Sequence, residues 1–258
     1  MANKTIKIYG RGYVGRAMLT LFPDALVHDP EQGLISTEDV DIAFVAVPTP
    51  LKDGRLDVSI VENLIKETND DLYVIRSTVM PGTCDYLTSL GKQVVMQPEY
   101  LGETVNHPMT DQKGRQFMIL GGSPENRRKV IELYQNVYNA LINIRQVSCL
   151  EAEVIKLSEN RAIAFKVAQC QELYDACEKA GVDYYTIRDA VYGDDPRMNL
   201  WWTFVYPDKR GFSSKCIPKD VYGWASWAES VGLNPELTKK LLSVNEKYLN
   251  DSYRHNSI

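Results

Sequence analysis

Histidine is scarce in this chain: only His28, His107 and His255 occur among 258 residues. So few imidazole groups disfavour a histidine-based catalytic triad and a histidine-rich metal site, and we expect no bound metal. Any acid–base chemistry would therefore rest on lysine, carboxylate and thiol side chains.

Long apolar runs and clustered positive charge are also missing. The longest apolar run, Ile42 to Val47, has six residues, far fewer than a membrane span needs. The amino terminus leads into the strand-like Thr5–Tyr9 without an apolar signal segment. The net charge is −5, and lysines and arginines are scattered among acidic residues. We therefore expect a soluble, cytoplasmic protein that binds neither nucleic acid nor membrane.

The cysteines lack the paired spacing of a zinc site or a redox motif. They are odd in number, at Cys84, Cys149, Cys170, Cys177 and Cys216. This usage is typical of reduced thiols in a cytosolic protein rather than of a disulfide framework.

Residues 1–148 alternate short β-rich runs with helical segments, the pattern of a Rossmann-type α/β domain with a parallel sheet. Several runs are continuously apolar, as expected of strands buried on both faces. The expected strands are Thr5–Tyr9, Ala25–His28, Ile42–Val47, Leu72–Arg76, Gln93–Met96, Gln116–Leu120 and Leu141–Ile144. Helices are expected at Tyr13–Phe22, Val58–Thr68 and Pro124–Tyr138.

Residues 149–258 predict a second, all-α domain. Glu151–Ala180 contains no proline or glycine, and Gly181 stands where a glycine would end the helix. Apolar residues spread around most of this helix, so we expect it to pack on several sides and to form a homodimer. Further helices are expected at Lys219–Ser230 and Pro235–Asn250.

A dinucleotide site is indicated by the segment Gly10–Gly15, which follows a predicted strand and opens a predicted helix. Asp29 ends the next strand, 19 residues after Gly10. Its carboxylate could accept from the adenosine ribose and would repel a 2′-phosphate, which favours NAD over NADP. A capping aspartate ahead of Pro30 is the alternative interpretation of the same residue.

The second chemical signal is a thiol, Cys216, four residues ahead of the carboxylate Asp220. Pro218 between them predicts a helix start, where the helix dipole would stabilise a thiolate. A small buried cysteine is the structural alternative. Together with a nicotinamide cofactor, a thiol suggests oxidation through a covalent thiohemiacetal.

Seven segments of the chain, in order, resemble the UDP-glucose/GDP-mannose dehydrogenase family of four-electron oxidising sugar-nucleotide dehydrogenases. They are Gly10–Gly15 (GRGYVG), Val47–Pro50 (VPTP), Ser77–Thr83 (STVMPGT), Pro98–Glu103 (PEYLGE), Glu151–Asn160 (EAEVIKLSEN), Asp195–Met198 (DPRM) and Cys216–Asp220 (CIPKD). The resemblance implies NAD as cofactor and a sugar nucleotide, UDP-glucose first, as substrate.

The same resemblance implies roles for individual residues. Cys216 would be the nucleophile, Lys156 and Asn160 would steady an oxyanion, and Asp220, Glu99 and Thr78 would complete the catalytic set. Cofactor contacts are implied for Gly10, Gly12, Tyr13, Val14, Gly15, Asp29, Pro48, Thr49, Thr78 and Glu103. Substrate contacts are implied for Glu99, Tyr100, Leu101, Glu103, Lys156, Asn160, Arg197, Phe212 and Lys219, with Arg197 reaching across a subunit interface.

Three features depart from the family pattern. The chain stops at Ile258, without the family's further α/β domain. Serines replace glycines in Gly211–Lys215, and the loop before Cys216 carries Trp201, Trp202, Phe204 and Tyr206. Such an aromatic cluster is more often core than a platform for a nucleotide base. No residue separates UDP-glucose from GDP-mannose or a UDP-N-acetylhexosamine, which remain alternative substrates. The missing domain and the altered loop keep a non-catalytic dinucleotide-binding dimer or half-enzyme as an alternative function.

Overall fold

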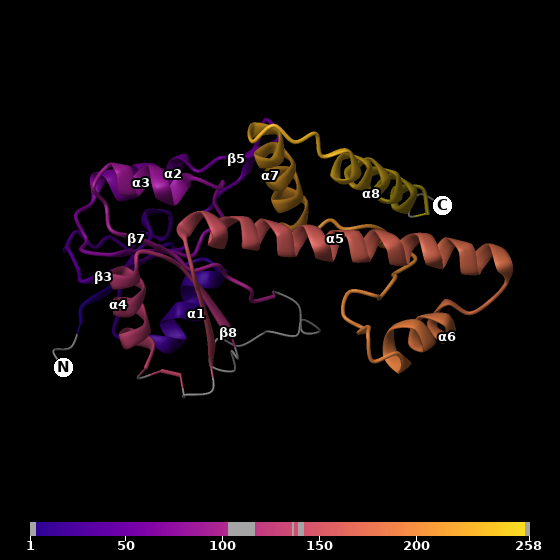
Figure 1. Ribbon diagram of the computed structural model, residues 1–258, viewed down its shortest axis with the longest axis horizontal. Helices are drawn as coiled ribbons and strands as arrows, with labels where there is room; N and C mark the ends of the chain where they lie inside the picture. The colour runs from indigo at the N-terminus through magenta and orange to yellow at the C-terminus, as the bar shows by residue number, and fades with distance from the viewer. Residues whose placement is uncertain (1–3, 103–116, 136, 139–141, 256–258) are drawn as a thin grey trace. The chain divides into compact units, whose positions relative to one another are not determined.

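The chain divides into two compact units, Met1–Lys156 and Leu157–Ile258. The computed structural model describes residues 4–102, 117–135, 137–138 and 142–255, with side chains through residue 250 (Figure 1). The sequence prediction put the domain boundary at residue 148, in front of the long helix. The division between the two compact units lies within that helix, α5 (Cys149–Ala180).

The first unit is built on a seven-stranded sheet in the order β2-β1-β3-β6-β7-β8-β9. Its strands are β1 Ile6–Tyr9, β2 Leu26–His28, β3 Ile42–Val45, β6 Tyr73–Ile75, β7 Val94–Met96, β8 Phe117–Gly122 and β9 Asn143–Val147. Neighbouring strands are parallel except β7 and β8, which pair antiparallel through Val95–Gly122 and Met96–Gly121. The predicted α/β fold with a mostly parallel sheet is therefore confirmed. The reversal at β8 was not predicted, because a continuously apolar run gives no sign of strand direction.

Helices cover both faces of this sheet. They are α1 Tyr13–Leu21, α2 Ser59–Glu67, α3 Thr83–Ser89 and α4 Pro124–Tyr134. Successive strand residues point to opposite faces, so that Val45 packs with α2 and α3 while its neighbour Phe44 packs with α1 and α4. Figure 1 shows the two helix pairs on opposite sides of the strands. This double cover explains why the strands are apolar along their whole length.

The structure contains a small hairpin that the sequence did not predict. Strands β4 (Leu51–Lys52) and β5 (Arg55–Leu56) pair antiparallel around Asp53 and Gly54, whose φ angles are 51° and 75°. Two central residues with positive φ define a type I′ turn, and an Asp-Gly dipeptide is a strong signal for it. The dipeptide was available in the sequence, but the strands are too short to show periodicity.

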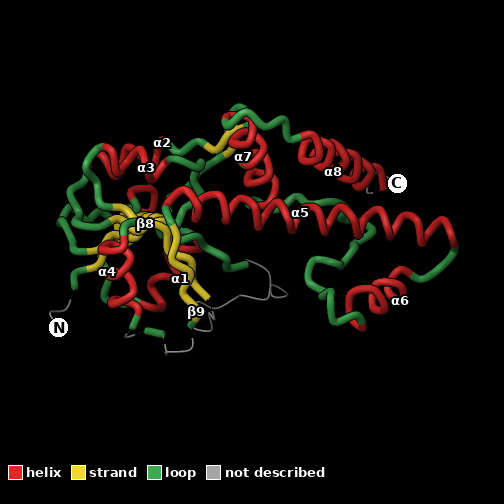
Figure 2. Tube along the Cα trace, viewed as in Figure 1, coloured by secondary structure: helices red, strands yellow, loops and turns green. Residues whose placement is uncertain are grey.

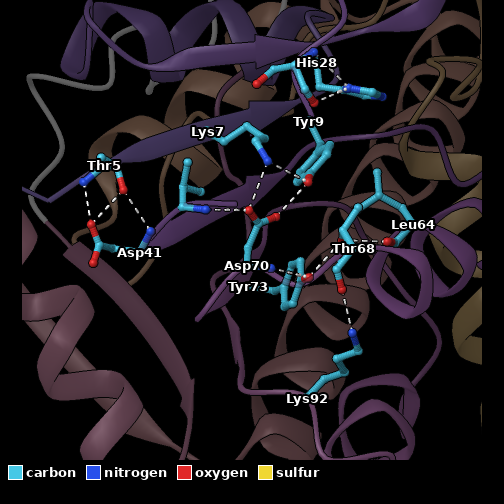
Figure 3. Close-up of polar contacts among 12 residues, drawn as sticks. Thr5, Lys7, Tyr9, His28, Asp41, Leu64, Thr68, Asp70, Tyr73 and Lys92 are labelled. Carbon is cyan, nitrogen blue, oxygen red and sulfur yellow. Dashed lines mark hydrogen bonds and ion pairs between the residues drawn. The ribbon is translucent and has the colours of Figure 1, made fainter. Parts of the chain in front are cut away.

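A buried polar network lies at the amino-terminal end of the strands (Figure 3). The Lys7 ammonium donates to Asp70 Oδ1 at 3.0 Å and to the Tyr9 hydroxyl at 3.2 Å, and Tyr9 donates to Asp70 Oδ2 at 2.7 Å. The amide of Val40 also donates to Asp70 Oδ1, at 2.9 Å. The network links β1 to the residues just before β3 and β6. Because Lys7 and Asp70 pair with each other, no charge in it is buried without a partner.

The second unit is helical in the described part of the chain (Figure 2). Its elements are the rest of α5, α6 Tyr184–Arg188, a π-helical turn Asp189–Asp194, α7 Ile217–Ser230 and α8 Glu236–His255. Gly181 ends α5 with φ +68°, as predicted. One core joins Ala164 of α5 to Val221 of α7 and Leu241 of α8. In the described residues, no helix has both the length and the apolar character needed to span a bilayer.

Helix α5 begins two residues earlier than predicted because of a reciprocal cap. The Ser148 hydroxyl accepts from the Glu151 amide at 3.2 Å, and Glu151 Oε2 accepts from the Ser148 amide at 2.7 Å. Hydrogen bonds from the Ser148 backbone and side chain lower the pKa of Glu151. The Ser-x-x-Glu spacing is a helix-start signal that was present in the sequence.

Candidate cofactor and catalytic site

The glycine loop fits a dinucleotide. A Cβ on Gly10 would lie 2.6 Å from the Ala46 carbonyl oxygen, and one on Gly15 would lie 1.9 Å from the Gly10 carbonyl oxygen. The Gly10 contact brings the loop against the end of β3, and the Gly15 contact holds the start of α1 against the end of β1, so a Cβ fits at neither position. A Cβ on Gly12 would meet nothing within 4 Å, so the space above the start of α1 is open. The first amides of α1, beginning at Tyr13 and Val14, can therefore receive a pyrophosphate there.

Asp29 stands beside this loop and also caps a short helix. Its Oδ2 accepts from the Arg11 amide at 2.6 Å and from Gln32 Nε2 at 2.9 Å, and its Oδ1 accepts from the Gln32 amide at 3.2 Å. The capping interpretation of Asp29 is thus present in the structure. A carboxylate has about four acceptor positions, so Oδ1 keeps one for a ribose hydroxyl. Gln32, which orients the carboxylate, carried no signal in the sequence.

The ends of β3 and β6 bring two candidate cofactor residues together. The Thr49 hydroxyl donates to the Thr78 carbonyl at 2.7 Å, and the Ser77 hydroxyl donates to the Val47 carbonyl at 2.7 Å. Pro48 lies between these bonds, and Thr49 is 6% exposed. In parallel sheets, ligands bind at this carboxyl edge, which is where the glycine loop also lies.

Glu99 lies in the same unit and is held by three donors. Its Oε1 accepts from the amides of Tyr100 and Leu101 at 2.6 and 2.8 Å, and its Oε2 contacts the buried Arg76 guanidinium. The ammonium of Lys156 lies 5.0 Å from the centre of the Tyr100 ring. The structure therefore gathers Glu99, Tyr100, Leu101 and Lys156. Glu103 lies outside the described residues.

A further carboxylate, Glu153, was not predicted. It is fully buried on α5, and it accepts from the amides of Gly82 at 2.7 Å and Cys84 at 2.8 Å. Burial raises the pKa of Glu153, against the hydrogen bonds that lower it. It fixes the Ser77–Thr83 segment to the turn of α5 that carries Lys156. Its backbone partners are about 70 residues away in sequence, so no local spacing revealed it.

In the second unit, Asp220 is the centre of a buried polar cluster. It is fully buried and accepts from Asn160 Nδ2 at 2.5 Å and from the Lys219 ammonium at 2.7 Å. Cys216 is exposed at the cap position of α7, and its carbonyl accepts from the Asp220 amide at 3.0 Å. The helix thus begins directly after the thiol, as predicted. The hydroxyl of Ser214 accepts from the Ile217 amide at 3.2 Å, so a serine of the altered segment satisfies the first amide of α7.

Arg197 and Phe212 differ in their surroundings. The Arg197 side chain is 83% exposed and pairs with Asp195 at 2.6 Å. The Phe212 side chain is buried in the core of the second unit, and its amide and carbonyl both bond to the Asn245 side chain. Of the two, only Arg197 presents its side chain to solvent.

The aromatic loop is not a core, contrary to the usual interpretation of such clusters. Trp201 and Phe204 are each 46% exposed and Tyr206 is 54% exposed. The Arg188 guanidinium lies 5.0 Å from the centre of the Phe204 ring. The loop therefore offers aromatic surface to solvent. The other four cysteines are buried, as small apolar side chains usually are.

Comparison with known proteins assigns both parts of the chain. Residues 32–142 match the NAD binding domain of the UDP-glucose/GDP-mannose dehydrogenase family, and residues 150–247 match its central domain. The chain is 28% identical to UDP-glucose 6-dehydrogenase of Rickettsia typhi over 221 residues, covering 81% of this chain and 50% of that protein. It is 28% identical to UDP-glucose 6-dehydrogenase TuaD of Bacillus subtilis, covering 84% and 50%.

The fold also resembles that of a solved structure. A UDP-glucose dehydrogenase from Pyrobaculum islandicum superposes with a TM-score of 0.77 at 24% identity, covering 95% of this chain and 68% of that one. The chain spans about half the length of the curated relatives that it matches. The NAD binding domain precedes the central domain in this chain, in the same order as the sequence motifs. The chain therefore belongs to the UDP-glucose/GDP-mannose dehydrogenase family and carries that family's NAD binding and central domains.

Proposed function

We propose that this chain oxidises the C6 hydroxyl of a sugar nucleotide to a carboxylate with NAD⁺, and that UDP-glucose is the substrate. The observation that carries the proposal is the cluster in which the buried Asp220 of α7 binds Asn160 of α5 and Lys219, four residues after the exposed thiol of Cys216. Buried, hydrogen-bonded polar groups beside a reactive atom can hold charge at a fixed place. The names of the relatives support the substrate class.

The proposed reaction has two oxidations. When bound, NAD⁺ would supply the hydride acceptor for these oxidations, one molecule for each. In the first, the C6 hydroxyl loses its proton to a base and becomes an aldehyde. The Cys216 thiolate then adds to the aldehyde carbon, and the resulting thiohemiacetal oxygen becomes the carbonyl of a thioester in the second oxidation. Water attacks that carbonyl, the thiolate leaves, and the carboxylate is released.

The chain's own residues have separate tasks in this scheme. Lys156 and Asn160 lie one turn apart on α5, and we assign them to the oxyanion that forms when the thiolate adds. Asp220 keeps Asn160 and Lys219 in place through its two carboxylate oxygens. Glu99, anchored by Arg76, and Thr78 are assigned to the water. Arg197 is assigned to substrate binding because its guanidinium is exposed.

The test is the stoichiometry of NADH and the identity of the product, followed by absorbance and mass spectrometry over a panel of sugar nucleotides. The wild-type chain should form two NADH and one uronate for each sugar consumed. Cys216→Ala should stop acid formation, because no covalent intermediate forms. Cys216→Ser should stall at the ester, since an alkoxide is a poorer leaving group than a thiolate.

Ser213→Ala removes a hydroxyl from the same exposed loop and should leave the uronate yield unchanged. A normal uronate yield from Cys216→Ala would refute the assignment of the nucleophile. If the wild-type chain binds NAD⁺ but forms no NADH with any sugar nucleotide, the chain is a dinucleotide-binding protein rather than a complete dehydrogenase.

A further inference from the structure

Arg11 occupies the variable position between the first two glycines of the loop. Its side chain is exposed, and Nη1 lies 3.4 Å from Gln32 Oε1. Its Nε and Nη2 donate to no residue within the described part of the chain. The 3.4 Å contact is long for a hydrogen bond, so the guanidinium can exchange it for a better acceptor.

The backbone of Arg11 contacts Asp29, the carboxylate that is assigned to the ribose of the cofactor. The Arg11 amide donates to Asp29 Oδ2 at 2.6 Å, and Gln32 Nε2 bridges Asp29 Oδ2 and the Arg11 carbonyl at 2.9 and 3.2 Å. Arg11, Asp29 and Gln32 thus form one cluster beside the glycine loop. Gln32 contacts both the Arg11 guanidinium and the Asp29 carboxylate, so a single side chain separates the guanidinium from the group assigned to the ribose.

A phosphate on the ribose 2′-oxygen would meet two opposing charges in the cluster. Asp29 repels it, which favours NAD⁺. The planar guanidinium of Arg11, with two nitrogens still able to donate, matches a phosphate in a bidentate geometry. The balance between these two side chains therefore sets how strongly the site rejects a 2′-phosphate.

We propose that Arg11 forms a 2′-phosphate subsite, which gives the NAD site a residual affinity for NADP⁺ that Asp29 opposes. The proposal rests on dinucleotide binding alone and not on sugar oxidation. A chain that oxidises no sugar nucleotide can still confirm or refute it.

The test is calorimetric titration with NAD⁺, NADP⁺, AMP and adenosine 2′,5′-bisphosphate, of which the last two isolate the phosphate from the nicotinamide. Arg11→Ala should weaken NADP⁺ and the bisphosphate about tenfold, the size of one charge-assisted contact. The same variant should change NAD⁺ and AMP less than about twofold, because they carry no 2′-phosphate. Arg128→Ala, which removes another exposed arginine, from α4, should change none of the four.

A second set of titrations changes Asp29, whose charge opposes phosphate binding. Asp29→Asn should strengthen NADP⁺ at least about tenfold when Arg11 is present, and the double variant with Arg11→Ala should lose that gain. The proposal is overturned if Arg11→Ala weakens NAD⁺ and NADP⁺ equally. It is also overturned if the gain from Asp29→Asn persists without Arg11, or if neither the wild type nor Asp29→Asn binds NADP⁺. Retained NAD⁺ affinity shows in each variant that the site is folded.

Discussion

A single carboxylate serves two purposes in the cofactor site. Asp29 caps the helical turn Pro30–Gln32 and at the same time accepts from the Arg11 amide in the glycine loop. The cap fixes the direction of the carboxylate, and one lone pair remains for the ribose. A local structural role and a binding role are therefore compatible at this residue, although the sequence presented them as alternatives.

At the residue scale we expect NAD⁺ to bind at least tenfold more tightly than NADP⁺, a difference of about 1.4 kcal/mol. The reason is the repulsion between Asp29 and a 2′-phosphate, which Arg11 reduces but does not cancel. Competitive titration of the wild-type chain measures the ratio. Asp24→Asn, a change of the same chemistry at an exposed position after α1, should leave the ratio unchanged. Equal affinities for the two cofactors would refute the ribose role of Asp29.

Several site residues had no signal in the sequence. Gly10, Gly15 and Asp29 were readable because their spacing is local and their chemistry is specific. Arg76 and Glu153 were not, since each binds a partner far away in the chain: Arg76 contacts Glu99, and Glu153 accepts from backbone amides. A buried side chain bonded to distant groups leaves no pattern in its own neighbourhood.

At the element scale, hydrophobic pattern predicted most strands and long helices but not their directions or the shortest elements. The strands β1, β3, β6 and β7 were expected because they are apolar or β-branched and are bounded by turn residues. Helix α3 (Thr83–Ser89) was not expected, because its seven residues are mostly polar and show no apolar stripe. Its first turn depends instead on the Glu153 carboxylate of α5.

Glu153→Ala should therefore destabilise the first unit by about 2–4 kcal/mol, since the partly buried amide of Gly82 and the buried amide of Cys84 lose their acceptor. Urea denaturation measures the change. Glu125→Ala removes an exposed glutamate from α4 and should change the free energy of unfolding by less than about 0.5 kcal/mol. A loss from Glu153→Ala no larger than that of the control would contradict the anchoring role.

The same carboxylate predicts a pH dependence. Burial raises the pKa of Glu153 above its ordinary value of 4.5, so the folded state holds this proton more tightly than the unfolded state does. The contribution of Glu153 to the free energy of unfolding is thus greatest below pH 4.5 and falls as the pH rises through the higher, folded-state pKa. The stability advantage of the wild type over Glu153→Gln should shrink across that range. An advantage that grew with pH would contradict this sign.

At the scale of the whole molecule, several large apolar side chains of the second unit are exposed. Trp201, Phe204 and Val191 are each at least 40% exposed, and Phe165 and Val167 of α5 are only partly buried. Surface of this kind commonly marks an interface.

We expect a homodimer formed through this second unit, with α5 at its centre. Light scattering over a concentration series around the micromolar range should give twice the mass of the chain. A monomer with full activity at those concentrations would refute the dimer. It would also remove the reason to assign Arg197 a role across a subunit interface.

The anchoring of α3 by Glu153 also decides where the NAD binding domain can be cut for separate expression. A fragment that ended at residue 148, ahead of the long helix, would lose the acceptor for the amides of Gly82 and Cys84 and the Ala152 methyl that packs against Gly121. A fragment that ended at Lys156 keeps both. The first eight residues of α5 therefore belong, for protein production, to the domain that precedes them.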